Sequence, residues 1–254
     1  MLLNDKELLR YSRHIMLPDI DLHGQEKLLD AKVLIIGAGG LGSPVALYLA
    51  ASGVGEISIV DYDVVELNNL QRQIAHNEAN IGQLKVQSCA DSMKKINADI
   101  KINTIDHELQ EDELLSQVAM ADIVVDCTDN LSSRFEINQA CVTHKTWLVS
   151  AAAIRWEGQI SVYHCGYDDS PCYHCFYGGR GELDQSCSNN GVLSPVVGVM
   201  GSMQAIEVIK LILNQENNCG DNLVGRVLLF DALSMQWESM ELGKNPNCSV
   251  CGNN

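Results

Sequence analysis

The sequence predicts an α/β fold built on a doubly wound, mostly parallel sheet that antiparallel strands extend. Strand-like and helix-like segments alternate from Ala31 onward. A glycine-rich turn joins the first strand to the first helix within VLIIGAGGLGSPVA, residues 33–46. The chain has 254 residues, of which 46% are hydrophobic and 5 are prolines, so one large domain can bury a substantial core.

The predicted elements follow the order of repeated βαβ units. The first 30 residues form a helical preface, because ELLRYSRHIML places apolar residues at helical spacing. The predicted strands cover residues 31–37, 56–61, 100–106, 122–128 and 146–152, and the predicted helices cover residues 43–53, 85–97, 111–120 and 132–144. This order implies right-handed crossovers between parallel strands, but it does not give the order of the strands in the sheet.

The pattern changes near Gln159. QISVYHC (159–165) and RVLLFDAL (226–233) predict an antiparallel pair, which a polar loop at 177–191 and a long apolar helix separate. Ser194 and Pro195 suit the N-cap and first position of that helix. We therefore divide a single domain, residues 1–254, into a helical preface (1–30), a βαβ part (31–158) and a C-terminal part (159–254).

Charge and patterning exclude several classes of partner. The formal net charge of −16 argues against binding to a nucleic-acid backbone or an anionic membrane surface. Residues 33–55 and 188–206 carry no charge and are long enough to span a membrane, yet Gly, Ser, Asn or Pro residues interrupt both, which favours buried core. MLLNDKELLR has no basic segment followed by an apolar run, so we expect a cytoplasmic protein.

The glycine-rich turn predicts a Rossmann-like nucleotide site. GAGGLG fits the G-x-G-x-x-G pattern through Gly37, Gly39 and Gly42, and Asp61 follows at the end of the next strand. Bare glycine backbone lets phosphates approach the helix N-terminus, and a carboxylate at the next strand accepts hydrogen bonds from ribose. Taken alone, this pattern favours NAD, and a tight turn without a ligand is the simpler alternative.

The polar stretch that follows favours ATP over NAD. A triphosphate needs cations and amide donors around its oxygens, whereas a nicotinamide needs an apolar slot. The candidate residues are Asp61, Asp63, Asn69, Arg72 and Gln73 in DYDVVELNNLQRQ, and Lys85 in IGQLKV. A solvated surface is the alternative interpretation for Arg72 and Lys85.

A second polar group follows the strand at 122–128. IVVDCTDN places Asp126, Asp129 and Asn130 at the carboxyl end of that strand, where ligands of open α/β sheets bind. A carboxylate beside a polyphosphate is a natural magnesium ligand, so Asp129 is the candidate. The alternative for Asp129 is that it caps the helix beginning with SSRFEI.

Two C-x-x-C pairs predict a zinc site. Cys172 and Cys175 form one pair, and Cys248 and Cys251 form the other, so together they offer four thiolates to one tetrahedral ion. Four thiolates leave no position for water, which favours a structural site over a catalytic one. Reduced surface thiols or a disulfide are the alternatives, and His174 inside the first pair is interpreted as a bystander.

The ordered motifs support a family resemblance. GAGGLG, DYDVVELNNLQRQ, GQLKV, DCTDN, AAAIRWEGQI and GVMGSMQAIEVIK, with the two C-x-x-C pairs, resemble the ThiF/MoeB/HesA family of ubiquitin-activating-enzyme-like adenylyltransferases over essentially the whole chain. The resemblance implies that a homodimer uses ATP to adenylate the C-terminal glycine of a ubiquitin-like sulfur carrier protein ending in Gly-Gly and releases pyrophosphate. Residues 31–158 would then bind the nucleotide, and residues 159–254 would bind the carrier and zinc.

The resemblance also implies roles for single residues. Gly40 would lie in the nucleotide-binding turn, Asp61 would hold the ribose, and Asp129 would hold magnesium with Asn130 nearby. Phosphate contacts would come from Asn69, Arg72 and Lys85. Arg13, in RYSRHI, matches an arginine that the family inserts from the other subunit, although a surface helix residue is the interpretation without the resemblance. Cys187 matches a cysteine that in some members bonds covalently to the carrier, while members that only adenylate also carry it.

The motifs fit two metabolic branches of the family. AAAIRWEGQI and NPNCSVCG favour the molybdenum-cofactor branch of the family, whereas LLFDALSMQW fits the thiamine branch about as well. No sulfur-donating domain follows in this sequence, so we expect a separate sulfur-transfer protein. The alternatives from other classes are an NAD-dependent oxidoreductase and a non-catalytic protein that docks the carrier.

Overall fold

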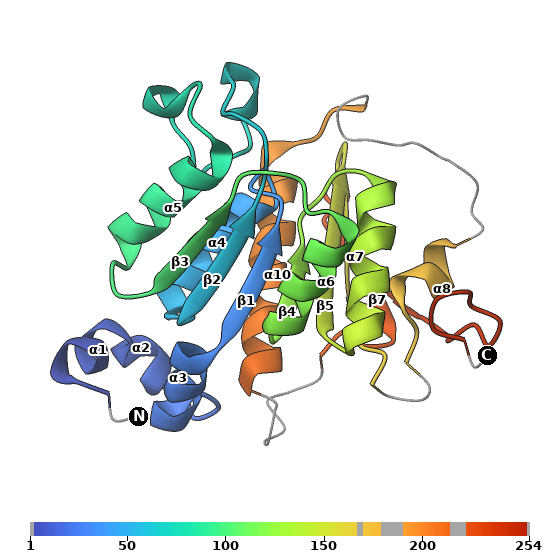
Figure 1. The fold of residues 1–254 in the computed structure, drawn as a ribbon, viewed down its shortest axis with the longest axis horizontal. Coiled ribbons are helices and arrows are strands. Elements are labelled where there is room, and N and C mark those ends of the chain that lie inside the picture. The colour runs from blue at the N-terminus through green and yellow to red at the C-terminus, as the bar shows by residue number, and fades with distance from the viewer. Residues whose placement is uncertain (1–2, 167–169, 179–189, 214–221, 253–254) are drawn as a thin grey trace.

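A single eight-stranded sheet forms the centre of the protein in a computed structural model (Figure 1). The structure describes residues 3–166, 170–178, 190–213 and 222–252, so Cys187 lies outside the described residues. The strand order is β3-β2-β1-β4-β5-β6-β7-β8. The predicted α/β class, with a parallel sheet that antiparallel strands extend, is confirmed. The division into three parts stays a prediction. Its boundary at residue 158 falls inside β6 (Glu157–Tyr163), a strand of the single sheet.

The first five strands are parallel. They are β1 (Lys32–Ile36), β2 (Glu56–Val60), β3 (Lys101–Ile105), β4 (Ile123–Asp126) and β5 (Trp147–Ile154). Ile36 pairs with Val60 on one side and with Asp126 on the other, so β1, β2 and β4 end side by side. The chain order reverses between β1 and β4, which is where open α/β sheets bind ligands beyond their carboxyl ends.

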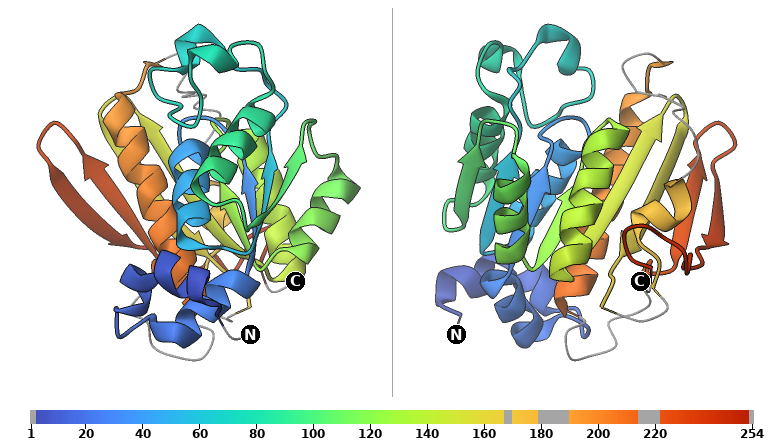
Figure 2. Two further views of the ribbon diagram at one scale, coloured as in Figure 1. Left: turned by 90° about the vertical axis from the view of Figure 1, so that its left-hand side faces the viewer. Right: turned by 45° about the vertical axis from the view of Figure 1, so that its right-hand side comes forward.

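The other three strands are antiparallel to their neighbours. They are β6 (Glu157–Tyr163), β7 (Arg226–Asp231) and β8 (Gln236–Glu241). The predicted antiparallel pair of β6 and β7 is confirmed, with Ile160 opposite Leu228. β8 was not predicted from the sequence. Its six residues are all exposed, and the β7–β8 hairpin stands at the end of the sheet (red in Figure 2).

Helices cover both faces of the sheet. They are α1 (Asp5–Arg10), α2 (Ser12–Ile15), α3 (Asp21–Asp30), α4 (Gly42–Ser52), α5 (Lys85–Ile96), α6 (Glu111–Met120), α7 (Leu131–His144), α8 (Tyr173–Tyr177) and α10 (Ser194–Leu213), with short 3-10 turns η1 (Leu67–Asn69) and η2 (Glu78–Asn80). One core cluster lies between the sheet and α4, α5 and α10, and a second lies between the sheet and α6 and α7. The result is a three-layer α/β/α arrangement (Figures 1 and 2).

α10 is the one described helix that is long and apolar enough to cross a membrane. Most of it is nevertheless buried against α4, β5 and β6. Inside this packing, Gln204 Nε2 donates hydrogen bonds to the carbonyls of Asp126 (2.8 Å) and Val149 (3.3 Å). α10 therefore forms part of the protein core. This confirms the prediction of buried core for the part of residues 188–206 that lies in α10.

Gly37 has a backbone conformation that other residues rarely adopt, with φ +103°. A Cβ atom there would lie 2.7 Å from the carbonyl oxygen of Cys127. We expect Gly37→Ala to lower the free energy of unfolding by about 2 kcal/mol or more. Chemical denaturation checks this against Gly243→Ala, because a Cβ at Gly243 would meet nothing within 4 Å. Equal losses in both variants would contradict the role given to the turn.

Candidate active site and metal centre

Asp61 holds the glycine-rich turn between β1 and α4. Its carboxylate accepts hydrogen bonds from the backbone N–H of Ala38 (2.8 Å) and of Asp63 (2.9 Å). Burial raises the pKa of Asp61, and the nearby positive charge of Lys85 opposes that rise. Each carboxylate oxygen retains a lone pair, so Asp61 can support the turn and still accept a ligand hydroxyl.

The turn presents unused hydrogen-bond donors at the N-terminus of α4. The backbone N–H groups of Gly39, Gly40 and Leu41 have no acceptor among the described residues. Gly39 and Gly40 line a cavity, and Gln73, which also lines it, is only 4% exposed. Gln73 Oε1 has no partner within the described ranges, so this buried amide has capacity for a ligand. Such a set of donors fits an anionic group.

Two predicted cationic residues lie beside the turn. Lys85 begins α5, its side chain is 8% exposed, and its Nζ lies 2.7 Å from Asp63 Oδ2. Arg72 is half-buried, and its Nη1 donates to the carbonyl of Asn68 at 3.1 Å. Both residues line the same cavity as the glycines. The structure therefore brings these two candidates together with the turn instead of leaving them on a solvated surface.

Residues 127–130, which follow β4 within DCTDN, also line this cavity. Asp126 accepts hydrogen bonds from the Thr128 hydroxyl and the Ser150 hydroxyl, both at 2.7 Å. Asn130 caps α7, because its Oδ1 accepts a hydrogen bond from the Ser133 N–H at 2.9 Å. The alternative interpretation of Asp129 as the helix cap is therefore wrong. Asp129 is exposed, lines the cavity, and forms no hydrogen bond with the described residues.

The cavity at the carboxyl ends of the strands has a volume of about 210 Å³. Its charged lining residues are the acids Asp61, Asp63, Glu108, Asp129 and Glu136 and the bases Arg72, Lys85 and Arg134. The excess of carboxylates would repel a polyphosphate unless a divalent cation lay between them. This donor set fits magnesium, which prefers carboxylate and phosphate oxygens.

A second cavity of about 580 Å³ adjoins the first and lies over β5 to β8. The two share Asp129, Asn130, Arg134 and Ala153 in their walls. The far side of the second cavity includes Tyr173, Tyr177 and Phe230, so it is partly aromatic. A ligand in the first cavity and a ligand in the second cavity would therefore contact each other beside Asp129.

Among the predicted site residues that the structure describes outside the cysteine cluster, Asn69, Gly42 and Arg13 do not line the first cavity. Asn69 accepts a hydrogen bond from the Glu66 N–H (3.2 Å) and supports η1. Gly42 packs its α-carbon against the Gly37 carbonyl, which leaves no room for a side chain. Arg13 is exposed on α2, whose neighbour Tyr11 packs against Gly53 at the end of α4, at the opposite end of the sheet. The ligand contacts expected of these residues stay predictions.

Arg134 is a functional candidate that the sequence analysis missed. It is 6% exposed, and its Nη2 donates to the carbonyls of Thr128 (2.6 Å) and Ala151 (3.0 Å). Its Nε lies 3.9 Å from Asp126 Oδ2. The sequence did offer a signal, because Arg134 lies three and four residues before Ile137 and Asn138 and so shares their buried face of α7. An arginine buried in this way needs a hydrogen-bond or charge partner.

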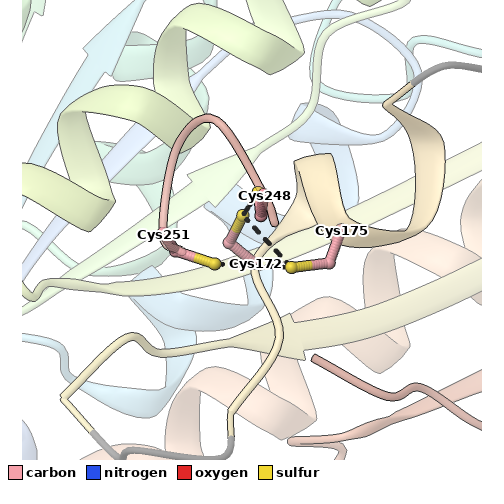
Figure 3. A group of neighbouring side chains, drawn as sticks. All are labelled: Cys172, Cys175, Cys248 and Cys251. Carbon is pink, nitrogen blue, oxygen red and sulfur yellow. Dashed lines mark hydrogen bonds between the residues drawn. The ribbon is translucent and has the colours of Figure 1, made fainter. Parts of the chain in front are cut away.

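The four cysteines of the two C-x-x-C pairs converge, as Figure 3 shows. Their sulfur atoms all lie within 4.8 Å of one another, with separations of 3.9 Å and 3.8 Å from Cys172 to Cys175 and Cys248, and 3.3 Å from Cys175 to Cys251. A tetrahedral zinc ion with Zn–S bonds of about 2.3 Å requires sulfur atoms about 3.8 Å apart. The geometry therefore fits the predicted zinc site.

The surroundings of the cluster also favour a cation. Burial, and then hydrogen bonds with neighbouring cysteine sulfurs, raises the pKa of Cys251. Several thiolates in so small a volume need a divalent ion to balance their charge. His174 Nδ1 lies 3.5 Å from Cys248 Sγ, outside the four-sulfur set. His174 is therefore placed to donate to a thiolate rather than to replace one.

The cavities and most of the cysteine cluster lie in a part of the chain that matches one protein family. The model of the ThiF family matches residues 11–250. The chain belongs to the ThiF family. The resemblance inferred from the motifs is thus confirmed, and the match spans the lining of the first cavity and three of the four clustered cysteines, ending one residue before Cys251.

Relatives of this ThiF-family chain are adenylyltransferases by name, including two that match over nearly their full length. The molybdopterin-synthase adenylyltransferase of Salmonella typhimurium is 43% identical over 98% of both chains. The sulfur carrier protein ThiS adenylyltransferase of Escherichia coli is 44% identical over 98% of this chain and 97% of that relative. Adenylyltransferase and sulfurtransferase MOCS3-1 of Zea mays is 49% identical over 96% of this chain, which spans only 52% of that longer protein.

Solved structures agree with this ThiF-family assignment. A structure of E. coli MccB with ATP superimposes with a TM-score of 0.77 at 28% identity, covering 91% of this chain and 69% of that chain. A structure of E. coli MccB with MccA-N7isoASN has a TM-score of 0.81 at 27% identity, covering 96% of this chain and 75% of that chain. The ThiF-family fold is therefore found in a protein whose crystals contain ATP.

Proposed function

We propose that this chain is an ATP-dependent adenylyltransferase that activates the C-terminal glycine of a ubiquitin-like sulfur carrier protein for molybdenum-cofactor biosynthesis. The observation that carries the proposal is the first cavity, where unused backbone N–H groups of the glycine turn lie beside Arg72, Lys85 and Asp129 in a ThiF-family chain. The enzyme class, a nucleotidyltransferase acting on a sulfur carrier, agrees with the names of two relatives that match over nearly their full lengths.

The two adjoining cavities suggest where each substrate binds. ATP would occupy the first cavity, with its phosphates beside the glycine turn. The C-terminal tail of the carrier would lie in the second cavity, over β5 to β8. Because Asp129, Asn130 and Arg134 belong to both walls, the carrier carboxylate would meet the α-phosphate at this boundary.

The reaction requires the enzyme to position the two substrates and to neutralise their negative charges. A carboxylate oxygen of the carrier attacks the α-phosphorus, the bond from that phosphorus to the bridging oxygen breaks, and pyrophosphate leaves. Arg72, Lys85 and the turn N–H groups hold the phosphates and reduce the repulsion between two anions. Asp129 would hold magnesium, which neutralises phosphate charge when bound. The four clustered cysteines line neither cavity, and they would hold zinc for stability.

The thiamine branch is the second candidate for the pathway. The relatives from the two branches are 43% and 44% identical, so overall identity does not separate them. The motifs AAAIRWEGQI and NPNCSVCG favour the molybdenum branch. A separate sulfur-transfer protein and a cytoplasmic location are further parts of this proposal.

The test is carrier-dependent exchange of radiolabelled pyrophosphate into ATP, with molybdenum-pathway and thiamine-pathway carriers compared. We expect exchange with the molybdenum-pathway carrier and less with the other, and the reverse would move the enzyme to the thiamine branch. Background exchange with every Gly-Gly carrier would instead support a non-catalytic docking protein. Tight binding of NAD(H) without ATP binding would support an oxidoreductase.

Arg13 provides a test of the proposed homodimer. It lies far from the cavity of its own chain, so it would reach only the site of a partner subunit. We expect Arg13→Ala and Asp129→Ala each to lose most exchange activity, and a 1:1 mixture of re-associated subunits to recover about a quarter of the wild-type value, because half of the dimers contain one intact site. Absence of recovery, with mixed dimers confirmed by mass spectrometry, would contradict an arginine supplied by the partner.

A further inference from the structure

The peptide unit between Ala38 and Gly39 is held by a buried histidine. His76 is 7% exposed, and its Nε2 lies 3.0 Å from the carbonyl oxygen of Ala38. Its Nδ1 lies 2.9 Å from the hydroxyl of Ser88 on α5. The preceding peptide unit is fixed separately, because the Ala38 N–H donates to Asp61. Two side chains from different segments therefore fix consecutive peptide units of the turn.

The hydrogen-bond partners define the tautomer of His76. A carbonyl oxygen only accepts, so Nε2 must carry a hydrogen and donate it to Ala38. Nδ1 is then the acceptor of the neutral ring, and the Ser88 hydroxyl donates to it. Burial lowers the pKa of His76, which agrees with a neutral ring at neutral pH.

Fixing the Ala38 carbonyl also fixes the direction of the Gly39 N–H. The described chain has no cis peptide bonds, and in a trans peptide the C=O and the next N–H point in opposite directions. The carbonyl points to His76, so the N–H of Gly39 points away from it. That N–H has no acceptor among the described residues, and Gly39 lines the first cavity.

α5 links this arrangement to a second phosphate-binding candidate. Lys85 and Ser88 are three residues apart on α5, so they lie on the same side of the helix. Lys85 lines the cavity, while Ser88 is fully buried and contacts His76. A single helix thus positions one cation directly and one backbone donor through the histidine.

We propose that His76 is a positioning residue that aims the Gly39 N–H at a phosphate group of the bound nucleotide. This inference rests on the proposed function, because it requires a nucleotide in the first cavity. His76 itself would touch no substrate atom. Its removal should therefore weaken recognition of phosphate and leave recognition of the nucleoside unchanged.

The test compares the affinities for ATP and for adenosine by calorimetry. We expect His76→Phe, which fills the space without a donor, to lose about tenfold in ATP affinity at unchanged adenosine affinity. His76→Gln, whose amide nitrogen can replace Nε2, should stay near the wild-type ratio. His76→Asn, whose amide is one methylene shorter, should resemble His76→Phe and serves in its place if the phenylalanine variant does not fold.

The outcomes separate the positioning role from a structural one. His164→Phe is the matched control, since His164 is half-buried, stacks on Trp147 and does not line the cavity. Equal losses for ATP and adenosine in the His76 variants, an unchanged ratio, or no difference between His76→Gln and His76→Asn would overturn the proposal. A wild-type protein that binds ATP no better than adenosine would instead overturn the proposed nucleotide function, and the positioning role with it.

Discussion

Asp129→Ala is expected to lower carrier-dependent pyrophosphate exchange by about 100-fold or more, while the protein stays folded. The loss follows because the cavity holds more carboxylates than cations, so removal of the magnesium ligand leaves phosphate charge uncompensated. The fold should persist because Asp129 is exposed and forms no hydrogen bond with the described residues. Exchange assays together with the thermal unfolding midpoint test both parts.

Two further variants separate charge from shape in this prediction. Asp129→Asn keeps the size of the side chain but removes its charge, so we expect nearly the same loss. Glu111→Ala removes an exposed carboxylate at the start of α6, outside the cavity lining, and should leave exchange unchanged. Normal exchange in Asp129→Ala would remove the magnesium assignment.

Cys248→Ser is expected to lower both bound zinc and stability. The wild-type protein should contain about one zinc ion per chain, because four sulfur atoms at tetrahedral spacing make one closed site. Structural zinc sites contribute about 10 kcal/mol or more in isolated peptides. A loss of a few kcal/mol here should lower the unfolding midpoint by roughly 10 °C. Elemental analysis and calorimetry on the same preparations measure the two effects.

Cys165→Ser is the matched control for the zinc prediction. Cys165 is half-buried and interacts with Cys172, but it is not one of the four clustered residues. We expect this variant to keep its zinc. Wild-type protein with far less than one zinc ion per chain after careful purification would contradict the site. Unchanged stability in zinc-depleted protein would contradict its structural role.

Much of the parallel part of the fold was predictable because β1 and β4 contain continuous apolar runs, whereas the edge strand β3 (KINTI) alternates apolar and polar residues. β1 and β4 read as VLII and IVVD, and both are buried on two faces. β8 was missed because its residues Gln236–Glu241 are all exposed, so hydrophobic burial left no pattern to find. The strand order was also beyond prediction, since it depends on packing between segments that are distant in the sequence.

Within the site, the sequence indicated several residues that line the cavity, but it did not indicate the hydrogen-bond partners of the buried side chains. Lys85 and Asp129 were found from composition after each strand, and both line the cavity. Arg134 and His76 were missed because their importance comes from contacts with backbone carbonyls of other segments. Helical spacing places Arg134 on the buried face of α7, but the carbonyl partners of Arg134 and His76 do not follow from local spacing, so only the folded structure shows those contacts.

α10 connects the two ends of the molecule. Its 20 residues make a helix about 30 Å long, with Val197 in the lining of the first cavity and the Leu213 carbonyl 3.4 Å from Lys27 Nζ on α3. Because α10 packs on α3, and α3 packs on α2, which carries Arg13, a shift of α10 caused by a ligand at Val197 would reach the N-terminal helices. If those helices serve a neighbouring subunit, the filling of one site and the competence of the other become linked, and each would influence the other equally.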